Sequence, residues 1–317
     1  MRERHPSGGR PTVAVVIITL NAEELIGDCL ASAQWADEII LVDAESSDRT
    51  VELAEPIADQ VVRRSWAGFS AQKNFAASLA TADWILHLDA DERVSSSLRD
   101  EMRTELSAAG DHVGFFLPRQ NFWLGRWIRH GGWYPDWSLR LYRRGAGVWE
   151  GLTHERLVIA GSLGYLKQPL QHFTYRSVQA HVERMILRSA PLEAREAIEH
   201  GVRIYRFFPV RPVVTVARRW LSGVPTPLRL RLLYKQHIKN RVEIAWLFPF
   251  MPLLRFIYMY VFRLGFLDGY PGFWVATLSA FYEAVRVAKI WEHFHSGDAA
   301  PGMVDRRPVW DQSVGRV

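Results

Sequence analysis

Short β-branched and aliphatic runs alternate with segments of helical spacing in the first ninety residues, and this alternation restricts the fold more than any other feature. The runs lie at Val13–Thr19, Glu38–Asp43, Gln60–Arg63 and Trp84–Leu88. Helical spacing follows the first three runs, over residues 22–32, 50–54 and 72–80. Strands that alternate with helices form a parallel sheet through right-handed crossovers. The sequence therefore predicts an α/β domain whose sheet is covered on both faces.

Polar side chains stand at the carboxyl ends of three of these strands. Asn21 follows the first strand, Asp43 ends the second, and Asp89 and Asp91 follow the fourth. Ligands of open parallel sheets bind outside the carboxyl ends of the strands. Side chains at i and i+2 of an extended chain project to one side, so Asp89 and Asp91 are expected to hold one divalent cation. The alternative is that they cap a helix expected from Ser95 onward.

Several classes of site are disfavoured by what the sequence lacks. No Gly-x-Gly-x-x-Gly and no Walker-type glycine loop follows the first strand, which argues against NAD and against ATP held by a phosphate loop. Cys29 is the single cysteine, so neither an internal disulfide nor a thiolate metal site is expected, and a reducing compartment fits. The apolar run from Val13 ends at Asn21 and is interpreted as a buried strand rather than a secretion signal.

Four blocks of sequence, taken in register, resemble the GT-A glycosyltransferases of family 2. The blocks are Thr19–Glu23, Asp37–Thr50, Gln72–Asn74 and Leu88–Glu92. Within that family they most resemble the lipopolysaccharide-core β-1,4-glucosyltransferase group. The resemblance covers residues 12–180 and continues more weakly toward residue 292. It implies a GT-A fold, a Rossmann-like and mostly parallel sheet flanked by helices, that performs an inverting transfer from a nucleotide-sugar.

The resemblance assigns roles to residues of these blocks. Asn21, Glu23 and Asp43 would contact the nucleoside. Asp91 would be the direct ligand of a divalent cation, Mg²⁺ or Mn²⁺. Asp89 would serve the donor ribose or reach the cation through water.

Three further residues are candidates for the same site, each with a plain structural alternative. Lys73 could pair with a phosphate or a carboxylate, or lie on a solvated helix face. Arg140 could steady a phosphate with two hydrogen bonds, or be a charge at a strand edge. His172 is the expected late histidine of the metal shell, and its alternative is an ordinary packed side chain.

An inverting transfer also needs a base that takes the proton of the acceptor hydroxyl. The stretch from Trp149 to Glu155 resembles the family's Trp-x-Gly-x-x-His-Glu block and makes Glu155 the first candidate. Asp136 is the second candidate.

The last third of the chain is basic and aromatic. Between residues 201 and 265 twelve Lys and Arg residues stand against one acid, Glu243. Ile244–Phe262 is nearly long enough to span a membrane, but Arg255 lies inside it and two prolines interrupt it. We expect this region to form helices that lie in the interface of an anionic membrane. We do not expect it to bind nucleic acid.

These observations predict four segments: a flexible N-terminus at 1–11, the GT-A domain at 12–180, a C-terminal amphipathic, membrane-associating helical extension at 181–295, and a disordered tail at 296–317. The expected activity moves a hexose, preferably glucose, from a UDP-sugar to a lipopolysaccharide-core or other lipid-linked acceptor. The expected location is the cytoplasmic face of the inner membrane, with peripheral or monotopic attachment. Two alternatives stay open: a transferase acting on polyprenyl phosphate, and a non-catalytic membrane-bound protein that binds nucleotide-sugars. The sequence leaves the sugar, the linkage, the choice of metal and the oligomeric state undetermined.

Overall fold

The computed structural model describes residues 9–151, 155–199 and 250–295. The chain divides into two compact units, Met1–Arg176 and Ser177–Val317, with the division close to the predicted end of the GT-A domain. The expected disordered tail at 296–317, most of the expected flexible N-terminus and much of the basic segment lie outside the described residues.

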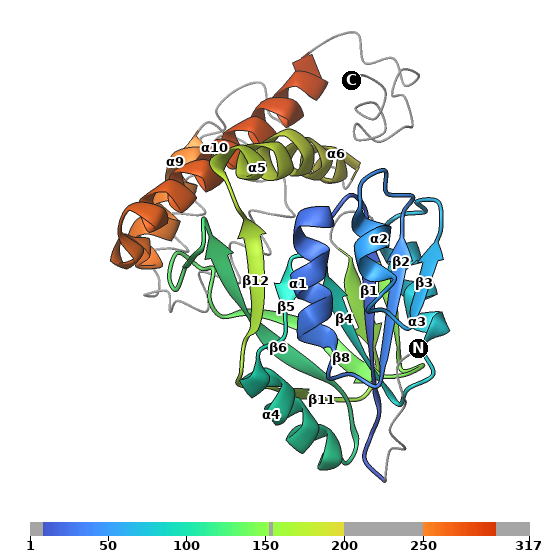
Figure 1. The fold of residues 1–317 in the computed structure, drawn as a ribbon. Helices are drawn as coiled ribbons and strands as arrows, with labels where there is room; N and C mark the ends of the chain where they lie inside the picture. Colours follow the sequence, from blue (N-terminus) through green and yellow to red (C-terminus); the bar gives the residue numbers. More distant parts are fainter. Residues whose placement is uncertain (1–8, 152–154, 200–249, 296–317) are drawn as a thin grey trace. The chain divides into compact units, whose positions relative to one another are not determined.

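The first unit is built on one large mixed sheet (Figure 1). The strands run in the order β3 (Gln60–Arg63), β2 (Glu38–Asp43), β1 (Val13–Thr19), β4 (Trp84–Asp89), β8 (Asp136–Arg143), β6 (His112–Trp123), β12 (Leu170–Tyr175) and β5 (Glu92–Arg93). Two more strands, β7 (Arg126–Trp127) and β11 (Ser162–Tyr165), pair with β6, while β9 (Gly147–Glu150) and β10 (Arg156–Ile159) form a separate hairpin.

The predicted α/β architecture is confirmed. Strands β3, β2, β1 and β4 are parallel neighbours, and they are the four strands expected from the sequence. The helices between them are α1 (Glu23–Ala33), α2 (Thr50–Ala54) and α3 (Phe69–Leu79). Beyond β4 the direction reverses, because β8 pairs antiparallel with both β4 and β6.

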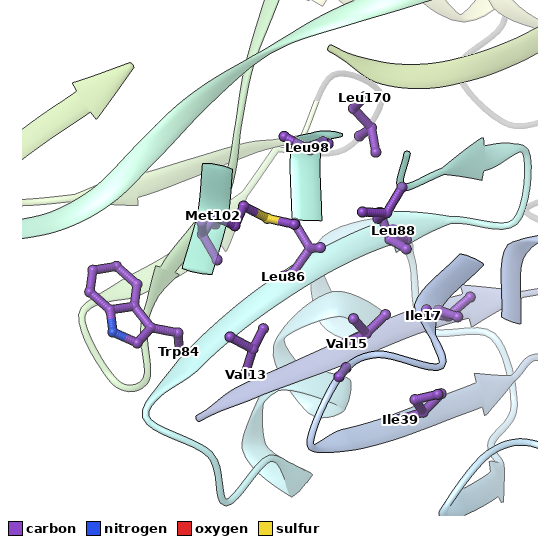
Figure 2. Close-up of a cluster of buried hydrophobic side chains, with 14 of the residues drawn as sticks. Val13, Val15, Ile17, Ile39, Trp84, Leu86, Leu88, Leu98, Met102 and Leu170 are labelled. Carbon is purple, nitrogen blue, oxygen red and sulfur yellow. The ribbon is translucent and has the colours of Figure 1, made fainter. Parts of the chain in front are cut away.

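The core has two layers, one on each face of the parallel strands. Val15, Ile17 and Leu86 point to the face that carries α1 and α4 (Ser96–Ser107), where Met102 packs against them (Figure 2). Alternate residues such as Val16 point to the opposite face, toward α3. This alternation explains why the strands are continuous apolar runs: both faces are buried.

The register of these strands aligns their carboxyl ends. Thr19 at the end of β1 pairs with Asp43 at the end of β2. Its neighbour Ile18 pairs with Asp89 at the end of β4. One edge of the sheet therefore carries the polar residues that follow three strands.

The described part of the second unit is helical. Its first helix passes from α5 (Val178–His181) through a π-helical stretch, Val182–Ser189, into α6 (Ala190–Glu199). Its second part runs from α9 (Met251–Ile257) through Tyr258–Phe262 and a 3₁₀ turn, Gly265–Asp268, into α10 (Gly269–His295). Ile186 and Ala190 pack against Tyr282, which joins α10 to the first helix. Among the described residues, no helix has both the length and the apolar character that a membrane crossing requires.

Candidate active site

The loops after β1 and β2 are tied together at the carboxyl edge. Asn21 has a left-handed backbone (φ 48°), and its Oδ1 accepts a hydrogen bond from the Ser47 amide at 2.9 Å. The Glu23 carboxylate accepts one from the Arg49 amide at 3.1 Å. Asp43 is fully buried and accepts from the amide of Ser46 at 2.8 Å. The three residues predicted to contact the nucleoside thus lie on adjoining loops, with Asn21 and Glu23 exposed and Asp43 beneath them.

Lys73 is buried in α3 and bridges two carboxylates from distant parts of the chain. Its Nζ lies 2.8 Å from Glu155 Oε1 and 3.3 Å from Asp89 Oδ1. The ammonium also lies 4.5 Å from the centre of the Trp149 ring, a cation–π contact. Only 1% of Lys73 is exposed, which excludes the solvated-helix alternative.

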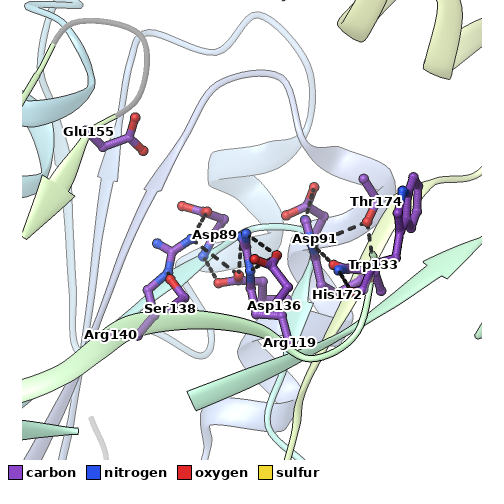
Figure 3. A network of polar contacts seen from close by, with 12 residues as sticks. Asp89, Asp91, Arg119, Trp133, Asp136, Ser138, Arg140, Glu155, His172 and Thr174 are labelled. Atoms are coloured by element: carbon purple, nitrogen blue, oxygen red, sulfur yellow. Dashed lines mark hydrogen bonds and ion pairs between the residues drawn. The ribbon is translucent and has the colours of Figure 1, made fainter. Parts of the chain in front are cut away.

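Arg140, on β8, holds Asp89 from the other side (Figure 3). Its Nη2 lies 2.7 Å from Asp89 Oδ2 and 3.4 Å from Glu92 Oε1. Burial acts to raise the pKa of Asp89, but Arg140 and Lys73 outweigh burial and hold that pKa well below the usual range. Burial likewise disfavours the charged form of Arg140, yet Asp89 and Glu92 raise its pKa. Asp89 is therefore a permanent carboxylate between two cations.

Asp136 is paired with an arginine. The start of β8 pairs with β6, so that Asp136 lies opposite Arg119. Arg119 Nε donates to Asp136 Oδ2 at 3.0 Å, and its Nη2 lies 2.5 Å from the same oxygen. Arg119 also lies 3.7 Å from Glu92, which links Asp136 to the Arg140 cluster.

Asp91 faces His172, a residue 81 positions later in the sequence, at 3.5 Å between Oδ2 and Nε2. Both side chains are buried. His172 Nδ1 lies 2.7 Å from Asn121 Oδ1, and Asn121 Nδ2 donates to the carbonyl of Trp133 at 2.8 Å. Because the Asn121 amide uses its nitrogen on Trp133, its oxygen accepts from His172, so Nδ1 carries the proton.

The separation of Asp89 from Asp91 follows from a turn. Strand β4 ends at Asp89, the chain turns at residues 90–91, and β5 begins at Glu92. The i, i+2 alternation therefore does not continue through Asp91, and the two carboxylates meet different partners. The helix-cap alternative is wrong, since Ser95 caps α4 by accepting from the Leu98 amide at 3.2 Å.

The residues around Asp91 fit a divalent cation. With the proton on Nδ1, a neutral His172 would turn the lone pair of Nε2 toward Asp91 Oδ2, 3.5 Å away, and the two atoms could then bind one metal ion. The hydrogen bond from Nδ1 to Asn121 is the outer contact that usually orients such a histidine. Within residues 9–151, 155–199 and 250–295, no group of three or more His, Cys, Asp or Glu side chains could hold a metal. The metal ligands from this chain would thus be Asp91 and His172, because the Asp89 carboxylate is already paired with Lys73 and Arg140.

Several members of this network were not predicted. Glu92 is fully buried and accepts from the Asp89 amide at 2.9 Å, yet its only signal was its place next to Asp91. Arg119 and Asn121 lie on β6, and no sequence motif marks them. Asn121 enters the site through the pairing of β6 with β12, which places it opposite His172.

A carboxyl-edge site of this kind, on a sheet whose parallel half continues into antiparallel strands, is the arrangement that the sequence resemblance implies for a GT-A glycosyltransferase. The model of the family described as "Glycosyl transferase family 2" matches residues 14–158. An uncharacterized glycosyltransferase of Rickettsia felis is 30% identical over 213 residues, which cover 62% of this chain and 73% of that protein. The chain belongs to glycosyltransferase family 2, as the four sequence blocks predicted.

Two further comparisons cover different shares of the chain. "Lipopolysaccharide core biosynthesis glycosyltransferase LpsC" of Rhizobium meliloti is 28% identical over 230 residues, or 67% of this chain and 82% of that protein. Among solved structures, glucosyl-3-phosphoglycerate synthase from Mycobacterium tuberculosis matches with a TM-score of 0.30 at 21% identity. That match covers 36% of this chain and 44% of the synthase, less than half of either.

Proposed function

We propose that this chain is a metal-dependent, inverting transferase that moves glucose from a UDP-sugar to a lipopolysaccharide-core or other lipid-linked glycan. The observation that carries the proposal is the buried Asp91–His172 pair beside the cation-held Asp89, at the carboxyl edge of a family 2 domain. The name of the Rhizobium meliloti relative supports the acceptor class, and the four sequence blocks support the donor. The glucose transfer would take place on the cytoplasmic face of the inner membrane.

The donor would lie along the carboxyl edge. Asn21, Glu23 and Asp43 would contact the nucleoside through the loops after β1 and β2. Arg140 has a buried Nη1 without a hydrogen-bond partner in the described structure, a cationic donor suited to an anionic ligand. Asp91 and His172 would hold Mg²⁺ or Mn²⁺, and the bound cation would offset the charge on the diphosphate leaving group.

The acceptor side of the reaction falls to Glu155. The acceptor oxygen forms a bond to the anomeric carbon while the bond from that carbon to the diphosphate oxygen breaks. UDP leaves with the electron pair, and the hydroxyl proton passes to the base. Lys73 lies 2.8 Å from the Glu155 carboxylate, and Arg119 holds that of Asp136, so both candidates are paired with a cation. The choice of Glu155 over Asp136 rests on the resemblance of residues 149–155 to the family's Trp-x-Gly-x-x-His-Glu block.

Loss of the metal ligand tests the proposal directly. Asp91→Ala should abolish glucose transfer from UDP-glucose, and EDTA should abolish it in the wild type until Mn²⁺ or Mg²⁺ is restored. Arg49→Gln, which alters an exposed ion pair in the same unit, is the control and should keep full activity. Full activity of wild-type protein in excess EDTA would show that the mechanism is wrong.

A second substitution separates the two acceptor classes. Glu155→Gln should lower kcat by about 10²–10⁴-fold with an unchanged KM for UDP-glucose if the acceptor is a sugar hydroxyl. A polyprenyl-phosphate acceptor needs no strong base, so unchanged turnover would favour that alternative. Asp136→Asn serves as the comparison and should have the smaller effect on kcat.

A further inference from the structure

The turn that joins α9 to α10 carries a dense group of exposed apolar side chains. We call it the apolar tip and define it by Phe262, Leu264, Phe266, Leu267, Tyr270 and Trp274, which are 71%, 46%, 46%, 56%, 83% and 49% exposed. All six fall within thirteen consecutive residues, from the end of the π-helical stretch Tyr258–Phe262 to the first residues of α10. Exposed apolar side chains concentrated in this way are typical of a site that binds a protein or a membrane.

The backbone of the tip is closely packed, so the exposure of its six apolar side chains belongs to the conformation of the turn itself. A Cβ on Gly272 would clash with the Gly265 carbonyl oxygen, and one on Gly265 would meet the Met259 carbonyl oxygen at 2.7 Å. Leu264 holds a left-handed backbone with φ 57°, a conformation that leucine rarely adopts. Two glycines thus allow a close approach of the chain within this turn.

Other aromatic residues of the same turn hold its two arms together. Phe273 packs edge-on against Phe256 and Tyr260, with ring centres 5.8 Å and 5.7 Å apart. Phe256 stacks on Tyr260 at 5.3 Å. Two residues of the tip also contact this cluster, Phe266 against Tyr260 at 6.3 Å and Trp274 against Phe273 at 5.3 Å. Phe262, Leu267 and Tyr270 can therefore be substituted without changing these ring contacts.

The charge of the tip, and of the sequence that precedes it, favours a lipid surface as the occupant. Between residues 250 and 274 the charged side chains are Arg255, Arg263 and a single acid, Asp268. In the sequence before α9, residues 201–242 contain ten Lys and Arg residues and no acid. Apolar and aromatic side chains combined with basic charge suit the interface of an anionic bilayer.

We propose that the apolar tip inserts into the headgroup region of an anionic bilayer and holds the enzyme there without crossing the membrane. The choice of a bilayer over a protein partner rests in part on the proposed lipid-linked acceptor. Tyr270 and Trp274 have the amphipathic rings that settle at headgroup depth, and Leu267 and Phe262 supply apolar area.

Vesicle flotation with the full chain tests this, without sugar donor or acceptor. The probe is a vesicle of phosphatidylcholine and phosphatidylglycerol, with pure phosphatidylcholine alongside. The triple variant Phe262→Ser, Leu267→Ser, Tyr270→Ser should lose about tenfold or more of the wild-type affinity, because it removes most of the inserted apolar area. The matched control is Val178→Ser, Leu187→Ser, Leu192→Ser, which changes three exposed apolar side chains of the same unit and should bind as wild type does.

Each other result overturns the inference. The tip is not a lipid anchor if wild-type protein binds neither kind of vesicle, or if the triple variant floats as well as wild type does. The surface instead binds a second copy of the chain if wild-type protein binds no vesicle and sediments as a dimer that the triple substitution dissociates. Because glucose transfer to a detergent-dispersed acceptor is measured separately, a failed anchor leaves the proposed reaction intact, and a failed reaction leaves the anchor intact.

Discussion

Replacing Lys73 by Met should destabilise the first unit by about 3 kcal/mol, because it removes a buried cation that two carboxylates share. Met keeps the length and flexibility of the side chain, so the change is mainly one of charge. The pairs concerned are the contacts of Nζ with Glu155 at 2.8 Å and with Asp89 at 3.3 Å.

The magnitude follows from what each carboxylate retains. Breaking a buried ion pair by removing one partner costs about 3–5 kcal/mol, since the remaining charge is left uncompensated. Asp89 keeps Arg140 at 2.7 Å, and the Glu155 side chain is 18% exposed and gains water. These two facts place the expected loss of unfolding free energy at the lower end of that range, about 3 kcal/mol. In the double variant Lys73→Met, Glu155→Gln, no uncompensated charge remains on residue 155, so we expect a coupling energy of about 1–2 kcal/mol.

The assay is equilibrium unfolding in urea for wild type, both single variants and the double variant, followed by tryptophan fluorescence and circular dichroism together. Two probes are needed because a chain of two units need not unfold in one step. Arg49→Gln is again the control: its pair with Glu52 is exposed, and its loss should cost less than about 0.5 kcal/mol. Additive single effects, or a Lys73→Met loss as small as that of Arg49→Gln, would refute the shared-cation reasoning.

Two further predictions concern histidines. Asn121→Ala should weaken the binding of Mn²⁺ about 10–100-fold, measured by thermal shift against metal concentration, because it removes the acceptor that orients His172; unchanged metal affinity would contradict this. Burial lowers the pKa of His181 to about 4, below its unfolded value, so the unfolded chain takes up the proton first as the pH falls. The stability linked to His181 is complete above about pH 6.5 and is lost toward pH 4, at most about 2 kcal/mol by pH 5. Unfolding at pH 7 and pH 5 should show this loss in wild type and not in His181→Gln.

Three of the four parallel strands were predictable to the residue, and β4 continues one residue beyond its predicted end at Leu88. The apolar runs that end at polar residues made this possible. Helix α3 was harder: it begins at Phe69, three residues before the predicted start, after Gly68, which offers no side chain as a cap. The antiparallel half of the sheet escaped prediction, since its two longest strands, β6 and β8, mix polar with apolar residues and its shortest have only two residues.

The candidate site shows the same contrast between local and distant information. The residue types at the carboxyl edge were visible in the sequence, and their order along the chain gave the family. The partners were not visible, because strand pairing selects them: His172 meets Asn121 across β12 and β6, and Arg140 reaches Asp89 from β8. One turn at residues 90–91 changed a shared pair of aspartates into two separate roles.

The charge of the assembled network gives an independent reason to expect a metal. It contains three cations, Lys73, Arg119 and Arg140, and five carboxylates, those of Asp89, Asp91, Glu92, Asp136 and Glu155. The excess of two negative charges lies where a donor diphosphate, itself an anion, would bind. Like charges in a partly buried site repel strongly because water screens them poorly. A divalent cation held by Asp91 and His172 would cancel that excess, so EDTA should weaken the binding of UDP as well as stop the transfer of sugar.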